Sequence, residues 1–317
     1  MKHPRPRHWS VFDEARRSPR EIAGSDAGRD GAGQGWASAQ RRTGRRRRIA
    51  WCLFVGLASA TAPGLAADSG PSTPSPPTAF DMKAFRPTFV EEFRSFTGSP
   101  LGGPGRWRTT LAWGDRTLAA NKELQYYSDS SVGTDPFVLT ADGLEIHVTA
   151  GQNAKNLPYL SGVITTEGRF SQTYGYFEID AKLPSGFGFW PAFWLLPSDH
   201  SWPPELDVFE EYGKAPEIVS LTAHSGSGGK HDFTFRNVTV SDVTKNYHRF
   251  GVDWEADKIS WVIDGEIVFQ LPTPADMHKP MYMVANVAVT NRLDPNSLPG
   301  VMSIRSVRAY ARLAGSK

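Results

Sequence analysis

Short segments in which apolar and polar residues alternate follow one another from about residue 80 to the end of the chain. Residues 144–149 (Leu-Glu-Ile-His-Val-Thr) alternate strictly and follow Phe-Val-Leu-Thr across an Ala-Asp-Gly turn. Such alternation between turn residues is typical of β-strands with one buried face, and two strands joined this way form a hairpin. The same pattern recurs in residues 177–183, 190–196, 250–254 and 259–263. The chain is therefore predicted to form a succession of short strands.

The predicted strands are separated by Gly, Pro and Asp turns rather than by helical segments. Asp264-Gly265, between two of them, favours a type I′ hairpin turn. A chain without strand–helix alternation and without an internal repeat favours two packed sheets over a parallel α/β fold, a propeller or a solenoid. We therefore predict an all-β sandwich of two antiparallel sheets. A sandwich of this size can bend, and a bent sheet offers a concave cleft.

The chain of 317 residues divides into three parts. Within residues 1–67, the run Arg45-Arg46-Arg47-Arg48 directly precedes a short apolar segment and then small residues before Asp68. This order is typical of a secretory signal peptide. We therefore expect residues 1–67 to be a basic N-terminal segment and signal peptide, with an uncleaved membrane anchor as the alternative. The Pro- and Ser-rich residues 68–80 predict a linker, and residues 81–317 a folded domain.

The charge of the predicted domain differs from that of the whole chain. Residues 1–67 hold 13 of the 35 basic residues and 5 of the 33 acidic ones, so the remaining 22 basic and 28 acidic residues give a charge of about −6. This argues against a nucleic-acid partner. The single cysteine, Cys52, excludes a disulfide within the chain and a cysteine metal site, and the histidines lack metal-ligand spacing. We therefore predict no metal ligands.

An unusually acidic segment, Glu205-Leu206-Asp207-Val208-Phe209-Glu210, lies among the predicted strands. In a regular strand Glu205 and Asp207 share one face, and Phe209 and Glu211 continue it, while Glu210 points the other way. A β-bulge at Val208-Phe209 would instead bring Glu210 onto the acidic face and leave the apolar residues for the core. We favour the bulge, which makes Glu205, Asp207 and Glu210 a row of acids and Glu211 the rival candidate.

Two carboxyl groups on either side of a bond are what glycoside hydrolysis requires. One protonates the leaving oxygen and the other attacks the sugar or activates water. Closely spaced acids cannot all ionise easily, so one keeps its proton near neutral pH and can act as a general acid. The alternatives for the segment are a solvent-exposed acidic face and a site for a hard cation. The residues around it favour the catalytic interpretation.

The segments GFGFWPAFWLLP and WPPELDVFEE resemble the core of glycoside hydrolase family 16, whose bulged active-site strand has the pattern E-x-D-x-x-E. NKELQYYSDSS, GVITTEGRFSQTYGYFEIDAKLP and YHRFGVDWEADKISWVIDG resemble other segments of that family in the same order, so the likeness covers roughly residues 88–311. It implies a concanavalin-like β-jelly-roll and a retaining endo-acting β-glycanase, similar to bacterial exopolysaccharide glycanases and laminarinases. It also implies that Glu205 is the nucleophile, Glu210 the acid/base, and Asp207 the residue that positions the pair.

Several further residues are candidates for binding the sugar chain. Trp190 and Trp194 share one strand face, where indoles could stack on sugar rings, although a pair of core aromatics would show the same pattern. The resemblance favours substrate contact for Trp194 and leaves Trp190 open. The remaining candidates are Trp202, Asn121, Tyr126, His224 and Asn286, with a structural role for His224 as the alternative.

The resemblance also bears on ions and partners. Family members often bind a structural calcium through an Asp in the last strand, where this chain has Arg305-Ser306-Val307-Arg308. Because an Arg would repel a cation, we doubt the calcium and expect no cofactor. The expected partner is a β-linked polysaccharide, and we expect a secreted monomer without stable membrane insertion once the signal is removed.

The function predicted from the sequence is hydrolysis of β-1,3 and/or β-1,4 bonds in a glucan or a succinoglycan-like exopolysaccharide. A non-catalytic carbohydrate-binding protein on the same fold would not need both Glu205 and Glu210. A transglycosylase would keep the chemistry but pass the sugar to another sugar. A polysaccharide lyase would need a cationic cleft, whereas this one is predicted to be acidic.

Overall fold

The computed structural model describes residues 78–100, 105–213 and 215–315. These residues form β-strands joined by loops and by four single turns of 3₁₀ helix. The 3₁₀ turns are η1 (Met82–Ala84), η2 (Ala119–Asn121), η3 (Ser130–Val132) and η4 (Pro295–Ser297). The strands are β1 (Thr78–Ala79), β2 (Phe85–Glu91), β3 (Gly98–Ser99), β4 (Trp107–Arg108), β5 (Gln125–Tyr127), β6 (Phe137–Thr140), β7 (Gly143–Ala150), β8 (Tyr159–Ser161), β9 (Val163–Thr165), β10 (Gly175–Lys182), β11 (Phe189–Pro197), β12 (Glu205–Glu211), β13 (Ile218–Ser225), β14 (Asp232–Thr239), β15 (His248–Trp254), β16 (Lys258–Ile263), β17 (Glu266–Pro272), β18 (Met281–Val289) and β19 (Gly300–Arg312).

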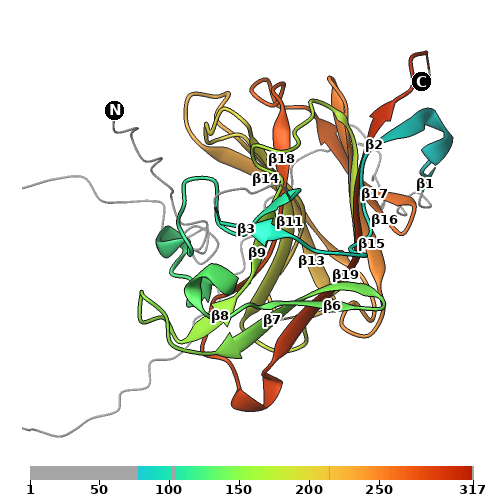
Figure 1. Ribbon diagram of the computed structural model, residues 1–317. Helices are drawn as coiled ribbons and strands as arrows, with labels where there is room; N and C mark the ends of the chain where they lie inside the picture. The colour runs from blue at the N-terminus through green and yellow to red at the C-terminus, as the bar shows by residue number, and fades with distance from the viewer. Residues whose placement is uncertain (1–77, 101–104, 214, 316–317) are drawn as a thin grey trace, which may run out of the picture. The chain divides into compact units, whose positions relative to one another are not determined.

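The strands form two sheets (Figure 1). One has eleven strands in the order β1-β17-β16-β15-β10-β19-β7-β8-β5, with β2 beside β19 and β6 beside β7. The other has eight, in the order β14-β13-β12-β11-β18-β9-β4-β3. The predicted all-β, two-sheet fold is confirmed. The prediction of wholly antiparallel sheets is wrong at two places, because β3 pairs with β4 and β5 with β8 in parallel. Neither pair is joined by a tight hairpin turn, which would require antiparallel pairing: residues 100–106 separate β3 from β4, and β6 and β7 lie between β5 and β8 in the chain.

The hydrophobic core lies between the two sheets and contains side chains from both. Phe193 and Leu195 of β11 belong to it, as do Phe250 of β15 and Trp261 of β16 in the other sheet. Trp194 of β11 belongs instead to a second apolar cluster, on the outer face of the eight-stranded sheet. The alternation seen in the sequence therefore separates a face that holds the sheets together from a face that is free to form a site.

The hairpin turn predicted at Asp264-Gly265 is present. Asp264 has φ of 52° and Gly265 of 87°, the two positive values that a type I′ turn requires. The turn joins β16 to β17 and so completes the edge of the eleven-stranded sheet. It positions that edge to receive β1.

The folded part begins a few residues before the predicted boundary at residue 81. Thr78 pairs with Ile267 of β17, and the backbone N–H of Phe80 donates to Gly265 O at 2.8 Å. The segment joins the sheet because Phe80 has an aromatic neighbour, Tyr176, with ring centroids 4.6 Å apart. The predicted signal peptide and most of the predicted linker lie outside the described residues. No helix in the described part of the chain is long and apolar enough to cross a membrane.

Strand β12 contains the predicted β-bulge. On its β13 side, Asp207 pairs with Thr222 and Glu210 with Ser220, so three steps along β12 match two along β13. The β11 side shows the same irregularity, because consecutive residues there pair with Phe209 and Asp207 and skip Val208. An extra residue in one strand reverses the alternation beyond it. Glu210 therefore faces the same way as Asp207.

A hydrogen bond across the core connects the bulge to the opposite sheet. Trp261 Nε1, on β16, donates to the backbone oxygen of Asp207 at 2.8 Å. Beside it, Phe209 packs on Phe250 of β15 with ring centroids 4.5 Å apart. The side chains of Trp261 and Phe209 are fully buried. The bulge is therefore held by the core rather than by solvent-exposed loops.

We expect Trp261→Phe to lower both stability and activity. The change leaves the buried carbonyl of Asp207 without its indole donor, which costs about 1–3 kcal/mol of the free energy of unfolding, and it loosens the backbone that carries the acids. Trp254→Phe is the matched control, since Trp254 is equally buried and donates to Met277 O at 3.1 Å, away from β12. Urea denaturation should show a loss of stability in both variants, whereas kcat for the β-glycan hydrolysis expected from the sequence should fall in Trp261→Phe alone. Equal kcat values in the two variants would contradict the role given to Trp261.

Candidate active site

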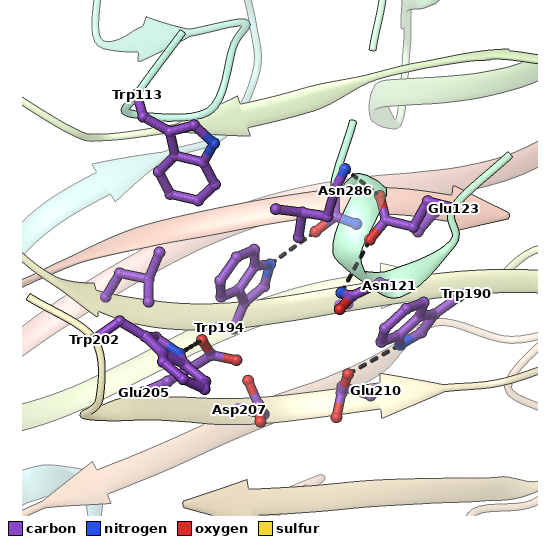
Figure 2. A pocket seen from close by; sticks show the side chains of 14 residues that line it. Trp113, Asn121, Glu123, Trp190, Trp194, Trp202, Glu205, Asp207, Glu210 and Asn286 are labelled. Atoms are coloured by element: carbon purple, nitrogen blue, oxygen red, sulfur yellow. Dashed lines mark hydrogen bonds between the residues drawn. The ribbon is translucent and has the colours of Figure 1, made fainter. Parts of the chain in front are cut away.

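A row of three carboxyl groups lies along β12 on the outer face of the eight-stranded sheet. Glu205, Asp207 and Glu210 all line one cleft, which encloses about 600 Å³ open to solvent. Figure 2 shows the row, with Trp202 at one end and Trp190 near the other. The apolar residues of the same strand point into the core instead: Leu206, Val208 and Phe209. The bulge makes this division possible, because two consecutive residues, Val208 and Phe209, both face inward.

Aromatic donors hold the two outer acids of the row. Trp202 Nε1 donates to Glu205 Oε2 at 2.7 Å. Glu210 has two such partners: Trp190 Nε1 donates to its Oε1 at 2.9 Å and the Tyr212 hydroxyl to its Oε2 at 3.1 Å. Each donor fixes a carboxyl group in one orientation while leaving it at the cleft surface.

The site raises the pKa of all three acids. Burial, together with the charge of Asp207, raises the pKa of Glu205 to about 8 against the opposing effects of His224 and Trp202. Glu210 also has a pKa of about 8, again chiefly through burial and the charge of Asp207. Burial raises the pKa of Asp207 to about 8, partly offset by a hydrogen bond with Glu205. The row is therefore unlike a solvated acidic surface, because its three acids cannot all ionise near neutral pH.

His224, on the neighbouring strand β13, contacts the central acid. Its Nε2 lies 3.2 Å from Asp207 Oδ2, near enough for an ion pair although outside hydrogen-bond geometry. Its Nδ1 lies 3.0 Å from His231 Nε2, so one ring donates to the other. Both His224 and Asp207 are buried. The candidate His224 thus lies beside the acid row, opposite Glu205, and its buried ring is not among the residues that line the cleft.

One group of residues in the described part of the chain could hold a metal ion. Glu205, Asp207 and His224 each offer a ligand atom, all within 4.8 Å of one another. Two carboxylates and an imidazole would suit a divalent cation. We assign no metal to this group, and the expectation of none stays a prediction. At the segment for which we doubted calcium, Arg308 Nη2 lies 3.5 Å from Glu92 Oε1.

A network of hydrogen bonds connects three strands beside the acid row. Trp194 Nε1, on β11, donates to Asn286 Oδ1 of β18 at 2.7 Å. Asn286 Nδ2 in turn donates to the Tyr127 hydroxyl, on β5, at 3.0 Å. Trp194 and Asn286 both line the cleft. Trp190 lines it too, because Trp190 and Trp194 share one face of β11. The network holds the indole of Trp194 rigidly at the cleft floor.

The segment before β5 forms the opposite wall of the cleft. Asn121 lines it, and its Nδ2 donates to Glu123 Oε1 at 3.3 Å. Glu123 is buried, which raises its pKa to about 7, and it also accepts the backbone N–H of Leu118 at 3.0 Å. Tyr126 does not line the cleft, since in β5 it points opposite to Tyr127. Its ring lies 5.7 Å from the guanidinium carbon of Arg116.

Glu211, the rival of Glu210, is directed away from the cleft. Its side chain is fully buried, its Oε1 accepts the backbone N–H of Gly213, and its Oε2 has no hydrogen-bond partner. Burial raises its pKa to about 8. The bulge therefore selects Glu210 over Glu211 as the third acid of the row.

The site also contains residues that sequence reasoning did not select. Tyr212 could have been found, because it lies two positions after Glu210 and shares its face. Trp113 lines the cleft from a loop (Figure 2), and nothing in the local pattern signals this. His231 reaches His224 only because the β13–β14 hairpin folds back. Loop residues and hairpin partners depend on tertiary packing, which the local pattern does not encode.

Comparison with known proteins identifies the family. Residues 120–300 match the sequence model described as glycosyl hydrolases family 16. The chain belongs to this family. The predicted resemblance is thus confirmed, and the cleft geometry above is that of a family member.

Similar proteins include two from Rhizobium meliloti (strain 1021). The endo-1,3-1,4-β-glycanase EglC is 36% identical over 249 residues, which cover 74% of this chain and 53% of that protein. The endo-1,3-1,4-β-glycanase ExsH is 37% identical over 223 residues, covering 67% and 48%. The chain thus spans about half the length of these relatives. Among solved structures, SCLam, a non-specific endo-β-1,3(4)-glucanase of the same family, superposes with a TM-score of 0.64 at 25% identity, covering 75% of this chain and 95% of that one.

The buried Glu211 should make stability depend on pH. Its folded pKa of about 8 exceeds the ordinary 4.5, so the folded state binds the proton more tightly and the free energy of unfolding falls as pH rises between these values. Glu211→Gln keeps an acceptor for Gly213 N–H and cannot ionise. As pH rises from below 4.5 to above 8, we expect the free energy of unfolding of this variant to increase relative to that of the wild type, by up to about 5 kcal/mol.

Urea denaturation at a series of pH values measures this difference. The matched control is Glu217→Gln, at an exposed position close to β13, which should keep the pH profile of the wild type. Parallel profiles of Glu211→Gln and wild type would show that Glu211 does not retain its proton in the folded protein.

Proposed function

We propose that this chain is a retaining endo-β-glycanase that hydrolyses β-1,3 and/or β-1,4 bonds. The observation that carries the proposal is the bulged strand β12, which directs Glu205 and Glu210 into one cleft on either side of Asp207. A non-catalytic binding protein would not need two such acids. Both acids line a cleft that also contains tryptophans, so a sugar chain bound there would lie beside two carboxyl groups, as glycoside hydrolysis requires.

In the first step Glu210 protonates the glycosidic oxygen while the ionised form of Glu205, which His224 and the hydrogen bond from Trp202 favour, attacks the anomeric carbon. The bond to the leaving sugar breaks, and Glu205 becomes esterified to the remaining sugar. A carboxyl group with a raised pKa can supply this proton near neutral pH, and Glu210 has a pKa of about 8. Asp207 lies between the two, where its charge discourages Glu210 from ionising too early.

In the second step Glu210, now ionised, accepts a proton from water, and the water attacks the same carbon from the vacated side. The ester to Glu205 breaks, and the released sugar keeps its β configuration because each step inverts it once. The donors Trp190 and Tyr212 stabilise the ionised form of Glu210 between the steps. The reaction uses only side chains of this chain and calls for no cofactor.

The proposed substrate is a β-linked polysaccharide, either a glucan or a succinoglycan-like exopolysaccharide. Two relatives named as endo-1,3-1,4-β-glycanases support this class. An open cleft accepts the interior of a long chain, which supports endo action. The basic run 45–48 and the apolar segment after it support secretion. We propose a secreted enzyme that acts as a monomer.

Three substitutions test the assignment of the acids. We expect Glu205→Gln and Glu210→Gln each to lower the rate of reducing-end formation from polysaccharides by at least about a thousandfold, since each removes an essential proton transfer or nucleophile. Glu211→Gln should keep nearly full activity, because the amide resembles the protonated buried acid. Proton NMR of the first product should show the β anomer. An inactive Glu211→Gln with an active Glu210→Gln would reverse the assignment.

The separate roles of the two acids can be tested by trapping. Glu210→Gln incubated with a dinitrophenyl β-glycoside of a short glucan should still complete the first step, because that leaving group needs no proton. The second step lacks its base, so a sugar ester should accumulate on the peptide that contains Glu205. Mass spectrometry of a peptic digest locates it. An ester on the peptide of another acid would contradict the assignment, and Glu205→Gln, which should form none, is the control.

A further inference from the structure

Beyond the acid row, the outer face of the eight-stranded sheet continues across two more strands to its edge. Strand β13 pairs with β12, and β14, the edge strand, pairs with β13. Residues directly opposite each other in antiparallel strands point to the same face. The face that carries the acids on β12 therefore extends onto β14, and the pairing shows which residues it presents.

Each of the three acids begins a row that crosses the sheet. Glu205 is opposite His224, and His224 is opposite Phe233. In the second row Asp207 is followed by Thr222 and then Phe235. In the third row Glu210 is followed by Ser220 and then Asn237. Two phenylalanines thus lie on the cleft face, at the side of the acid row opposite to Trp190 and Trp194.

The rings on this side form a continuous series from the acid row to the sheet edge. Trp202, whose indole donates to Glu205, lies 4.7 Å from His231 between ring centroids. His231 lies 6.0 Å from Phe233, and Phe233 lies 6.0 Å from Phe235. Adjacent strands are roughly 4.8 Å apart, so β14 lies about 10 Å from β12. That span is short enough for one sugar chain to reach both.

The outermost ring is open to solvent. Phe235 is 53% exposed, and its two neighbours along β14, Thr234 and Arg236, are polar. The opposite face of β14 is used differently, because Arg236 there lies 5.1 Å from the ring of Phe269. An exposed phenylalanine aligned with a row of site residues is unlike scattered surface apolar residues, which need no explanation.

We propose that Phe233 and Phe235 form a second aromatic platform, which binds sugar units of the polysaccharide on the far side of the acid row from Trp190 and Trp194. This deepens the proposed function and rests on it. The apolar faces of sugar rings stack on aromatic rings, and phenylalanine provides a wide, rigid surface for such contact. The Ser220 hydroxyl, which donates to Asn237 Oδ1 at 2.6 Å, leaves the Asn237 amide group beside the platform as a polar partner.

Binding measured without hydrolysis tests this platform. In a Glu205→Gln background, mobility in gels containing barley β-glucan or laminarin gives the affinity for the polymer. We expect Phe235→Ala to weaken it about three- to tenfold, the loss of one aromatic contact, and Phe235→Trp to preserve it. With Glu205 intact, Phe235→Ala should raise KM on the polymer and leave kcat within about twofold.

Two variants serve as controls. Thr234→Ala changes the neighbouring residue of β14, which points to the other face. Leu139→Ala removes an apolar side chain of similar exposure, 46%, from β6 in the other sheet. Both should bind the glucans as their parent does. Circular dichroism and thermal unfolding of each variant separate a local loss of contact from a loss of folding.

The outcomes distinguish the platform from the proposed function. Unchanged glucan affinity and KM in Phe235→Ala, with hydrolysis intact, overturns the platform alone. If Phe235→Ala weakens glucan binding but the wild type does not hydrolyse the glucans, the proposed function alone is overturned. If the wild type neither binds nor hydrolyses either glucan, nor succinoglycan assayed in the same way, both are overturned. If Phe235→Ala leaves glucan affinity unchanged but turns a dimer into a monomer in light scattering, the platform contacts a second copy of the chain, and the inference is wrong.

Discussion

The candidate site depends on one irregularity in strand β12, where Val208 and Phe209 both point into the core. Such an irregularity disrupts the regular pairing with both neighbouring strands and needs compensation from the surroundings. The core provides it through the hydrogen bond from Trp261 to the Asp207 carbonyl and through the packing of Phe209 on Phe250. Because these contacts come from the opposite sheet, the packing of the sandwich and the alignment of the acids are a single property of the fold. Neither sheet alone would hold Glu210 beside Asp207.

The row of carboxyl groups combines two features: its acids are buried from water, and hydrogen-bond donors of nearby aromatic side chains contact its two outer acids. Burial and mutual repulsion raise the pKa of Glu205 and of Glu210 to about 8. Hydrogen bonds from indole and phenol groups lower these two pKa values in part, and they orient both carboxyl groups without adding a positive charge. The aromatic residues near the acids thus have two roles, since they exclude water and orient the groups whose ionisation they oppose. This combination explains why the most acidic strand of the chain lies beside its tryptophans.

The same sheet geometry extends the influence of the acid row beyond β12. In an antiparallel sheet the transverse rows are fixed by register, so a single pairing places a residue of β13 and another of β14 beside each acid. On the β11 side, the network from Trp194 through Asn286 to Tyr127 anchors the floor of the cleft. On the β14 side, rings follow one another to the sheet edge. The sheet face that carries the acids therefore continues beyond the pocket that surrounds the carboxyl groups, as far as the edge strand.

The sequence by itself determined the all-β class, the hairpin at Asp264-Gly265, the indole face of β11 and the acids of β12, because all of these follow from alternation within one segment. Even the bulge could be predicted, since Phe209 and Glu210 would otherwise each lie on the wrong face. Tertiary structure alone decided that Trp261 anchors the bulge, that Trp113 reaches the cleft, and that Tyr126 points away from it. These contacts join segments far apart in the chain. Local patterns encode which face a residue prefers, whereas strand order and loop packing decide which residues that face will meet.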